Sequence, residues 1–291
     1  MTLRHAVASE HGLGPAPARS SVRPVAPGCV ASGDGLTSTL VFTEWFDWVL
    51  LLAVGFLSGA INAVAGGGSL LVFPALLATG MPPLAANVTN SVAQGPGFVG
   101  AVVGQWSDLA GQRRRLVITS TGAVLGSALG CALLLVLPDA VFDAVVPSLV
   151  GLSAVLLAFQ NTIRKWLGGG EHGPDRSLPL FLGIFSASVY GGYFGGARSV
   201  ILIAILALTV NDAMRRLNAV KSWLGLFGSA VTLVVYALVG PVDWLAVLLL
   251  APTTVIGGFG GGKLAQLLPA TALRYAVVVI AAVVAIYLAV E

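Results

Sequence analysis

Two basic residues lie inside apolar sequence, where a positive charge is costly. Arg198 follows the glycines of FGGAR, and Lys221 lies one helical turn after Asn218. A charge at the centre of a membrane helix costs at least ~2.5 kcal/mol, so it should face a partner or a watery cavity. The alternative is that each long side chain reaches the surface from near a helix end. The nearest acid in sequence, Asp212, lies at a span boundary. Together the two cations predict an anionic ligand.

Glycine-rich breaks interrupt two apolar stretches. The first is INAVAGGGSL, with Gly66, Gly67, Gly68 and then Ser69, and the second is FGGAR. Each glycine inside a helix costs about 1 kcal/mol relative to alanine. Helices that begin at such breaks offer unpaired N–H groups and positive dipole ends, which bind anions in inverted-repeat transporters. The alternative is that the glycines only permit close helix packing.

Four side-chain amides accompany the breaks. Asn62, Asn90, Gln94 and Asn218 can hydrogen-bond an oxyanion, although such groups also join helices at a modest gain. Taken singly, each amide is better interpreted as a helix contact. Asn90 and Asn218 recur 128 residues apart, each after a glycine break, so for this pair we favour ligand binding. The predicted site comprises Asn62, Gly66, Gly67, Gly68, Ser69, Asn90, Gln94, Gly195, Gly196, Arg198, Asn218 and Lys221.

The composition indicates the elements that must hold these residues. Hydrophobic residues make up 57% of the chain and charged residues 9%, against roughly 25% charged in soluble domains. Apolar runs long enough to cross a bilayer recur from Trp48 onward, without the period-two alternation of outer-membrane barrels. The sequence therefore predicts an all-α polytopic membrane protein. Two segments, 69–80 and 199–210, are only 12 residues long and reach roughly half to two-thirds of the hydrocarbon thickness, and the sequence leaves open whether they span fully or are re-entrant.

Several function classes are disfavoured. The formal charge of +3 is too small to suggest nucleic acid, and no phosphate-binding loop for ATP is present. The three histidines lie in tail or loop sequence and the aspartates near span ends, so we expect no metal, no cofactor and no intramembrane carboxylate relay. Neither a nucleophile nor an acid pair is visible in the spans, so an enzyme is not expected. Cys29 and Cys131 do not suggest a disulfide framework.

The chain repeats itself. A shift of 128 residues places Gly55 on Gly183 and Asn90 on Asn218, and the match resumes at a shift of 131. We predict a disordered tail over 1–40, a first transmembrane repeat over 41–160, a cytoplasmic linker loop over 161–177 and a second repeat over 178–291. Each repeat should hold about five helical segments.

Positive charge predicts how the repeats are oriented. The run Arg113 to Arg115 should be cytoplasmic, as should Arg164 and Lys165. An odd number of crossings in each half also brings Arg215 and Arg216 to that side. Inverted repeats in a bacterial plasma membrane fit this pattern better than parallel ones.

The stretch GFLSGAINAVAGGGSLLVFPALLATGMPPLAANVTNSVA resembles the signature of the sulfite exporter TauE/SafE family. A second signature, SVYGGYFGGARSV followed by RRLNAVKSW, is similar to that family as well, and Tyr190 within it joins the predicted site. The resemblance extends over nearly all of the chain after Trp48. Family members often carry glycine at the position of Ala197 and varied residues at that of Arg198, so Arg198 is expected to tune which substrate fits.

The resemblance implies transport of a small anion, such as sulfite or an organosulfonate like sulfoacetate. We therefore expect a secondary transporter that works by alternating access, with the anion between the two glycine breaks. The alternatives are an anion channel and a transporter of another small anion or carboxylate. The expected partners are the substrate and membrane lipid, with no nucleic acid, and the sequence leaves a homo-oligomer open.

Overall fold

The computed structural model describes residues 45–64, 66–167 and 177–264, and six further positions between 278 and 286. The predicted tail over 1–40 and most of the last apolar segment lie outside the described residues. Within the described ranges the chain is helical and contains no strand. The predicted all-α membrane protein is confirmed.

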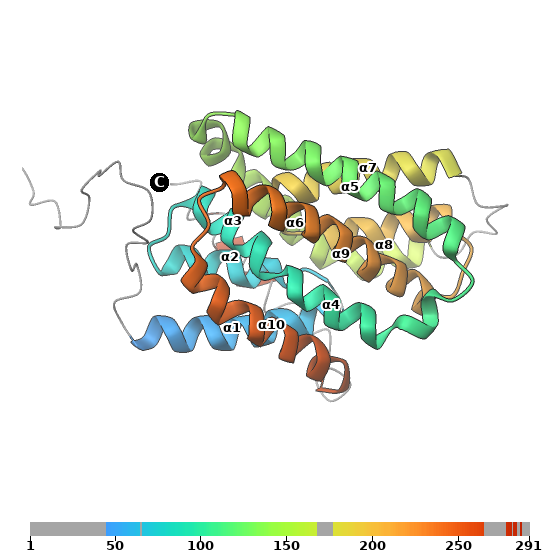
Figure 1. Cartoon of the computed structure of the whole chain (residues 1–291), viewed down its shortest axis with the longest axis horizontal. Coiled ribbons are helices and arrows are strands. Elements are labelled where there is room, and N and C mark those ends of the chain that lie inside the picture. The colour runs from blue at the N-terminus through green and yellow to red at the C-terminus, as the bar shows by residue number, and fades with distance from the viewer. Residues whose placement is uncertain are drawn as a thin grey trace, which may run out of the picture. The chain divides into compact units, whose positions relative to one another are not determined.

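The helices follow one another through short connections (Figure 1). They are α1 (Trp45–Val64), α2 (Ser69–Ala78), α3 (Pro83–Ala93), α4 (Gly95–Gly104), the 3₁₀ helix η1 (Trp106–Leu109), α5 (Arg113–Val136), α6 (Asp139–Leu167), α7 (Ser177–Tyr193), α8 (Arg198–Thr209), α9 (Met214–Val239) and α10 (Trp244–Leu264).

Two boundaries differ from the sequence prediction. The predicted single segment 84–106 divides at Gln94 into α3 and α4. Gly95 and Pro96 follow that position; proline lacks the N–H that would continue the helical ladder, and glycine loosens the backbone. In addition, α6 continues to Leu167, into the predicted linker over 161–177.

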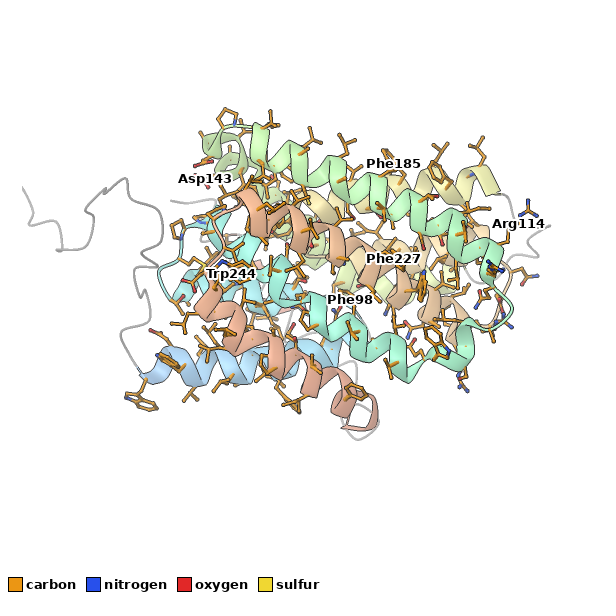
Figure 2. All side chains as sticks on the ribbon, in the orientation of Figure 1. Phe98, Arg114, Asp143, Phe185, Phe227 and Trp244 are labelled. Atoms are coloured by element: carbon orange, nitrogen blue, oxygen red, sulfur yellow. The ribbon has the colours of Figure 1, made fainter. Side chains whose placement is uncertain are left out.

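Three helical stretches are long and apolar enough to cross a membrane: α5, residues 139–159 of α6, and α9. Shorter apolar stretches occur in α1, α2, α7, α8 and α10. Large apolar side chains are exposed on these helices, as Figure 2 lets the reader follow. Val136 is 81% exposed and Leu238 is 77% exposed, which suits a lipid environment rather than water.

Glycines bring two pairs of helices into backbone contact. A Cβ on Gly257 of α10 would strike the carbonyl of Phe56 in α1, and a Cβ on Gly126 of α5 would strike that of Phe185 in α7. Small residues allow this close approach in membrane helices. Gly126 and Gly257 are equivalent under the shift of 131, so equivalent helices use equivalent contacts.

The short helices α2 and α8 are buried in different apolar clusters. Leu70, Phe73 and Leu76 of α2 belong to a cluster that includes residues of α3, α6 and α10. Leu202 and Leu206 of α8 belong to a second cluster with residues of α7 and α9. Val200, in the first turn of α8, nevertheless belongs to the first cluster, so α8 contacts both clusters.

The start of α9 lies beside η1 and the residue that follows it. Arg215 pairs with Asp108 at 2.8 Å, and Arg216 donates to the carbonyl of Ala110 at 3.0 Å. Asp212 pairs with Arg115 at 2.9 Å, so the arginines of both halves lie at one end of the molecule. Inverted repeats with their basic residues on one side of the membrane require the arginines of both halves at one end. The inversion of the repeats itself stays a prediction.

A candidate anion site between two helix starts

The two glycine breaks lie against each other. Gly66 and Gly67 have φ values of +77° and +92°, which side-chain-bearing residues rarely adopt, and they turn the chain from α1 into α2. A Cβ on Gly66 would lie 2.6 Å from Cβ of Ser199, and one on Gly196 would lie 2.9 Å from Cδ2 of Leu70. The first turns of α2 and α8 therefore meet.

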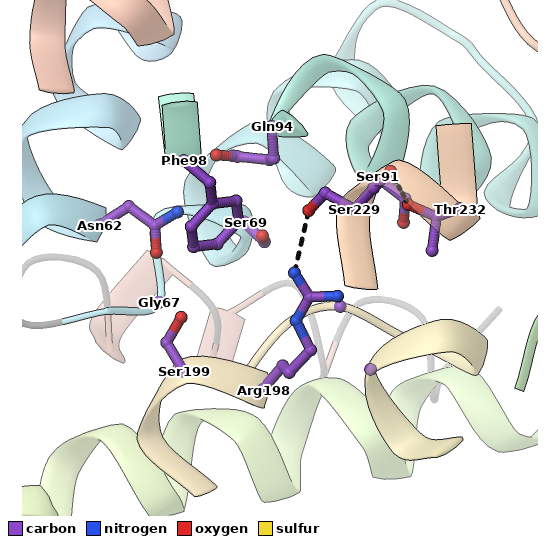
Figure 3. A pocket seen from close by; sticks show the side chains of 12 residues that line it. Asn62, Gly67, Ser69, Ser91, Gln94, Phe98, Arg198, Ser199, Ser229 and Thr232 are labelled. Carbon is purple, nitrogen blue, oxygen red and sulfur yellow. Dashed lines mark hydrogen bonds between the residues drawn. The ribbon is translucent and has the colours of Figure 1, made fainter. Parts of the chain in front are cut away.

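A small cavity of about 20 Å³ lies between them (Figure 3). That volume holds one or two water-sized groups. Its lining comes from α1, α2, α3, α4, α7, α8 and α9 and from both breaks: Asn62, Gly67, Ser69, Ser91, Gln94, Phe98, Gly191, Gly195, Arg198, Ser199, Ser229 and Thr232. Hydroxyl, amide and guanidinium groups dominate this list, and no carboxylate belongs to it.

Arg198 supplies the positive charge. Its Nη2 donates to the carbonyl of Gly225 at 3.1 Å and to Oγ of Ser229 at 3.0 Å, and its Cζ lies 5.4 Å from the ring centre of Phe98. Only 7% of the residue is exposed, so the guanidinium is buried rather than extended to the surface. Within the described parts of the chain no carboxylate forms an ion pair with it. Neutral dipoles and an aromatic ring are its partners.

Two further glycines make room for this side chain. A Cβ on Gly191 would overlap Cδ of Arg198, and one on Gly228 would lie 2.7 Å from its Nη1. Gly228 is equivalent to Gly100 under the repeat shift. A side chain at Gly228 would therefore compete with the guanidinium for the same space.

Amides form the opposite side of the site. Nε2 of Gln94 donates to Oγ of Ser58 at 2.6 Å and approaches Oδ1 of Asn90 at 3.5 Å. Oε1 of Gln94 is buried and has no hydrogen-bond partner among the described residues. Asn90 donates to the carbonyl of Ser69 at 3.5 Å. A half-turn of the Gln94 amide exchanges its oxygen and nitrogen, so it can offer an acceptor or donors to what fills the cavity.

The structure brings together part of the predicted set. Asn62, Gly67, Ser69, Gln94, Gly195 and Arg198 line the cavity. Gly66, Gly68 and Gly196 belong to the same two breaks without lining it, and Asn90 is joined to it through Gln94. Tyr190 lies outside the lining, with its hydroxyl 2.6 Å from Oγ of Ser153.

Asn218 and Lys221 also lie outside the lining. Nδ2 of Asn218 donates to Oε1 of Gln105, the residue that follows α4, at 3.3 Å. Nε2 of Gln105 donates in turn to Oγ of Ser222 at 3.4 Å. Lys221 is buried, with 2% of the residue exposed. The repeat pair Asn90 and Asn218 therefore does not converge on one cavity.

A polar stripe on α9 connects Asn218 with the cavity. Asn218, Ser222, Gly225, Ser229 and Thr232 recur at spacings of four and three, so they share one helix face. Sequence reasoning did not include Ser229 and Thr232, although this spacing from Asn218 was available to find them. It also did not include Ser91, Phe98, Gly191 and Ser199; their types carry no comparable signal.

These features define a helical membrane protein in which two interrupted helices begin at a buried arginine. The chain matches the family described as Sulfite exporter TauE/SafE over residues 51–288, and it belongs to that family. It is therefore a membrane transporter, as the resemblance in its sequence predicted.

Relatives with the same kind of name lie at low identity. A "Probable membrane transporter protein" of Haemophilus influenzae is 28% identical over 234 residues, covering 79% of this chain and 89% of the relative. "Probable membrane transporter protein ORF9" of Sinorhizobium sp is 25% identical over 252 residues, covering 82% and 90%. "Probable membrane transporter protein YfcA" of Escherichia coli K12 is 34% identical over 84 residues, covering 28% and 31%. No solved structure matches the chain.

Proposed function

We propose that this transporter carries a small sulfur-containing oxyanion, and that the cavity at Arg198 binds it. The observation that carries the proposal is a buried guanidinium with only neutral partners, at the point where two half-helices begin. A buried charge with no countercharge is costly. An anion between the two helix starts would supply that countercharge and meet the positive ends of both helix dipoles.

The donor set suits an oxyanion. The hydrogen bonds of Arg198 to described residues use Nη2, which leaves the Nε and Nη1 donors of the planar fork for a ligand. Hydroxyls of Ser69 and Ser199 line the same space and can donate to further oxygen atoms, while that of Ser229 accepts from Arg198. An ion with several oxygens on one central atom uses such donors from several directions at once.

The size of the cavity favours a compact ion. A volume of about 20 Å³ holds one or two water-sized groups, so sulfite requires a small widening of the cavity and an extended organosulfonate requires a much larger one. The description of the family as a sulfite exporter points to the same substrate class. Sulfite is therefore the first candidate, ahead of sulfoacetate and other sulfonates.

Transport by alternating access requires a polar path to each side. The α9 stripe leads from Ser229 to Asn218, toward the end that carries Arg215. On the other side, α3 carries Asn87, Asn90, Ser91 and Gln94 on overlapping turns. In this proposal the two apolar clusters around α2 and α8 close these paths in turn, and the anion moves when one cluster loosens.

Binding by the purified full-length protein tests the site. Ligand that binds the folded state raises its melting temperature, so sulfite, sulfoacetate, sulfate and acetate are compared in one thermal-shift series. Arg198→Gln is expected to weaken sulfite binding about tenfold to 100-fold, the range of a lost charge-assisted hydrogen bond. Arg215→Gln is the matched control, because Arg215 lies away from the cavity and is exposed. Unchanged sulfite affinity in Arg198→Gln would reject the site.

Electrical recording separates a carrier from a channel. A carrier is expected to give no unitary currents in a planar bilayer. The same carrier in liposomes preloaded with unlabelled sulfite is expected to exchange that sulfite for labelled sulfite added outside. Unitary anion currents would replace alternating access by conduction through the same helices.

A further inference from the structure

A second anion-binding feature lies at the arginine end of the molecule, away from the cavity at Arg198. A cavity of about 240 Å³ is lined by Arg114, Arg115 and Arg216, together with Gln112 and Leu180. We call it the arginine cavity. The run Arg113 to Arg115 begins α5, and Figure 2 places Arg114 at the outer end of that helix.

Three guanidinium groups line the arginine cavity. Oδ2 of Asp212 lies 2.9 Å from Nη1 of Arg115 and 3.3 Å from Nε of Arg216, so one carboxylate serves two guanidinium groups. No ion pair in the described ranges involves Arg114, which is exposed. The nearby carboxylate of Asp108 is paired with Arg215. Three arginines at one cavity, one of them exposed and outside any ion pair among the described residues, favour a ligand with negative charge.

An apolar groove adjoins the arginine cavity. The groove has a volume of about 460 Å³ and is lined mainly by Leu109, Leu116, Val117, Trp223 and Phe227, with Arg113 at its edge. Gly111 lines both the groove and the arginine cavity, so the two flank the same beginning of α5.

The wall of the groove is held by a ring contact and a hydrogen bond and includes an exposed residue. The rings of Trp223 and Phe227 pack with their centres 5.0 Å apart, and Nε1 of Trp223 donates to Oγ of Ser120 at 2.9 Å. Val117, on the same wall, is 58% exposed. A preformed apolar surface at this position, on a helix long enough to span the membrane, is suited to an acyl chain.

We propose that the two features together bind one anionic phospholipid. Its phosphate lies in the arginine cavity and one acyl chain lies along the apolar groove. The arginines that line the cavity are those that positive-inside reasoning assigns to the cytoplasmic surface, where anionic headgroups attract basic residues. A soluble anion has no apolar part to fill the groove, and a neutral lipid has no net charge to pair with the arginines. An anionic lipid has both an acyl chain and a negative charge.

Lipid-stripped, full-length protein in detergent tests the proposal, with phosphatidylglycerol, phosphatidylcholine and inorganic phosphate as probes. Phosphatidylglycerol is expected to raise the melting temperature, and native mass spectrometry is expected to detect one bound lipid. Phosphatidylcholine and phosphate should do neither. Arg114→Gln with Arg216→Gln should weaken phosphatidylglycerol binding about tenfold or more, whereas Arg215→Gln, at the same end but outside both features, should not.

Three results would overturn the proposal. Equal stabilisation by inorganic phosphate would make this a site for soluble anions, and equal stabilisation by phosphatidylcholine would remove the role of charge. Unchanged phosphatidylglycerol binding in the double variant would place the lipid elsewhere. If the double variant does not fold, two other measurements apply. Val117→Trp fills the groove from an exposed position and must lower the affinity for phosphatidylglycerol. Added sodium chloride must lower the affinity of the unaltered protein for phosphatidylglycerol. Failure of either also overturns the proposal.

Discussion

The guanidinium of Arg198 and the hydroxyl of Ser229 are joined by a hydrogen bond of 3.0 Å across the first turn of α8 and the middle of α9. This bond is the one side-chain hydrogen bond drawn to Arg198 in Figure 3. It connects a residue at a helix break in the second repeat with a continuous helix that lines the same cavity. The bond fixes the guanidinium against the α9 wall of the cavity.

Removal of that hydroxyl should destabilise the protein modestly. Ser229→Ala leaves Nη2 of Arg198 with the carbonyl of Gly225 as its hydrogen-bond partner, and loss of one bond to a charged group costs about 1.5–3 kcal/mol. We expect a lower melting temperature in the absence of ligand and a larger rise when sulfite is added, because the freed donor can bind the anion. Equal rises in the variant and the unaltered protein would contradict this account.

Gly228 should not tolerate a methyl group. Gly228→Ala places a Cβ 2.7 Å from Nη1 of Arg198, so the guanidinium must move from the cavity. We expect loss of sulfite binding in the thermal-shift assay together with a fall in stability of about 1–3 kcal/mol, the usual cost of overpacking. Gly104→Ala is the matched control, because no atom lies within 4 Å of its new Cβ. A variant at Gly228 that binds sulfite normally would show that the guanidinium position is unimportant.

The positions of the short helices can be predicted from the sequence. The short segments 69–80 and 199–210 form α2 and α8 within two residues, because glycine breaks and apolar length act locally. The division at Gln94 was not foreseen, although Gly95 and Pro96 were visible. Asn218 has the same place in its repeat as Asn90, yet Gln105 engages it away from the cavity. Residues that are equivalent in the two repeats occupy equivalent positions along their helices, but the side chains that contact them can differ.

Acid should weaken the arginine end of the molecule. Partial burial raises the pKa of the Asp212 carboxyl, but the hydrogen bond from Arg115, the backbone N–H of Ala213 and the charges of Arg216 and Arg115 outweigh it, so the pKa lies below its usual value. A depressed pKa gives stability that is fully present above the unfolded value, near 3.9, and is lost as pH falls through the folded value. Melting temperatures measured from pH 6 down to pH 3 should fall less steeply in Asp212→Asn than in the unaltered protein. Parallel curves would remove Asp212 from the acid response.

Gln105 should control one side of the transport path. Its amide bridges α4 to Asn218 and Ser222 of α9 through bonds of 3.3 and 3.4 Å, which are long enough to be exchanged readily for bonds to a passing oxyanion. Gln105→Leu removes both bonds and places an apolar group on the stripe, while the cavity at Arg198 lies further along α9 and keeps its contacts. We therefore expect sulfite affinity within about twofold of normal but sulfite exchange in liposomes slowed about tenfold or more, because a polar ion must now pass an apolar group without replacement bonds. Thr121→Val is the control, because Thr121 is an exposed residue of α5 and the hydrogen bonds of its hydroxyl stay within its own helix. Gln112→Leu would not serve, because Gln112 contacts Arg115. Equal exchange rates in Gln105→Leu and Thr121→Val would mean that the anion does not pass along the α9 stripe.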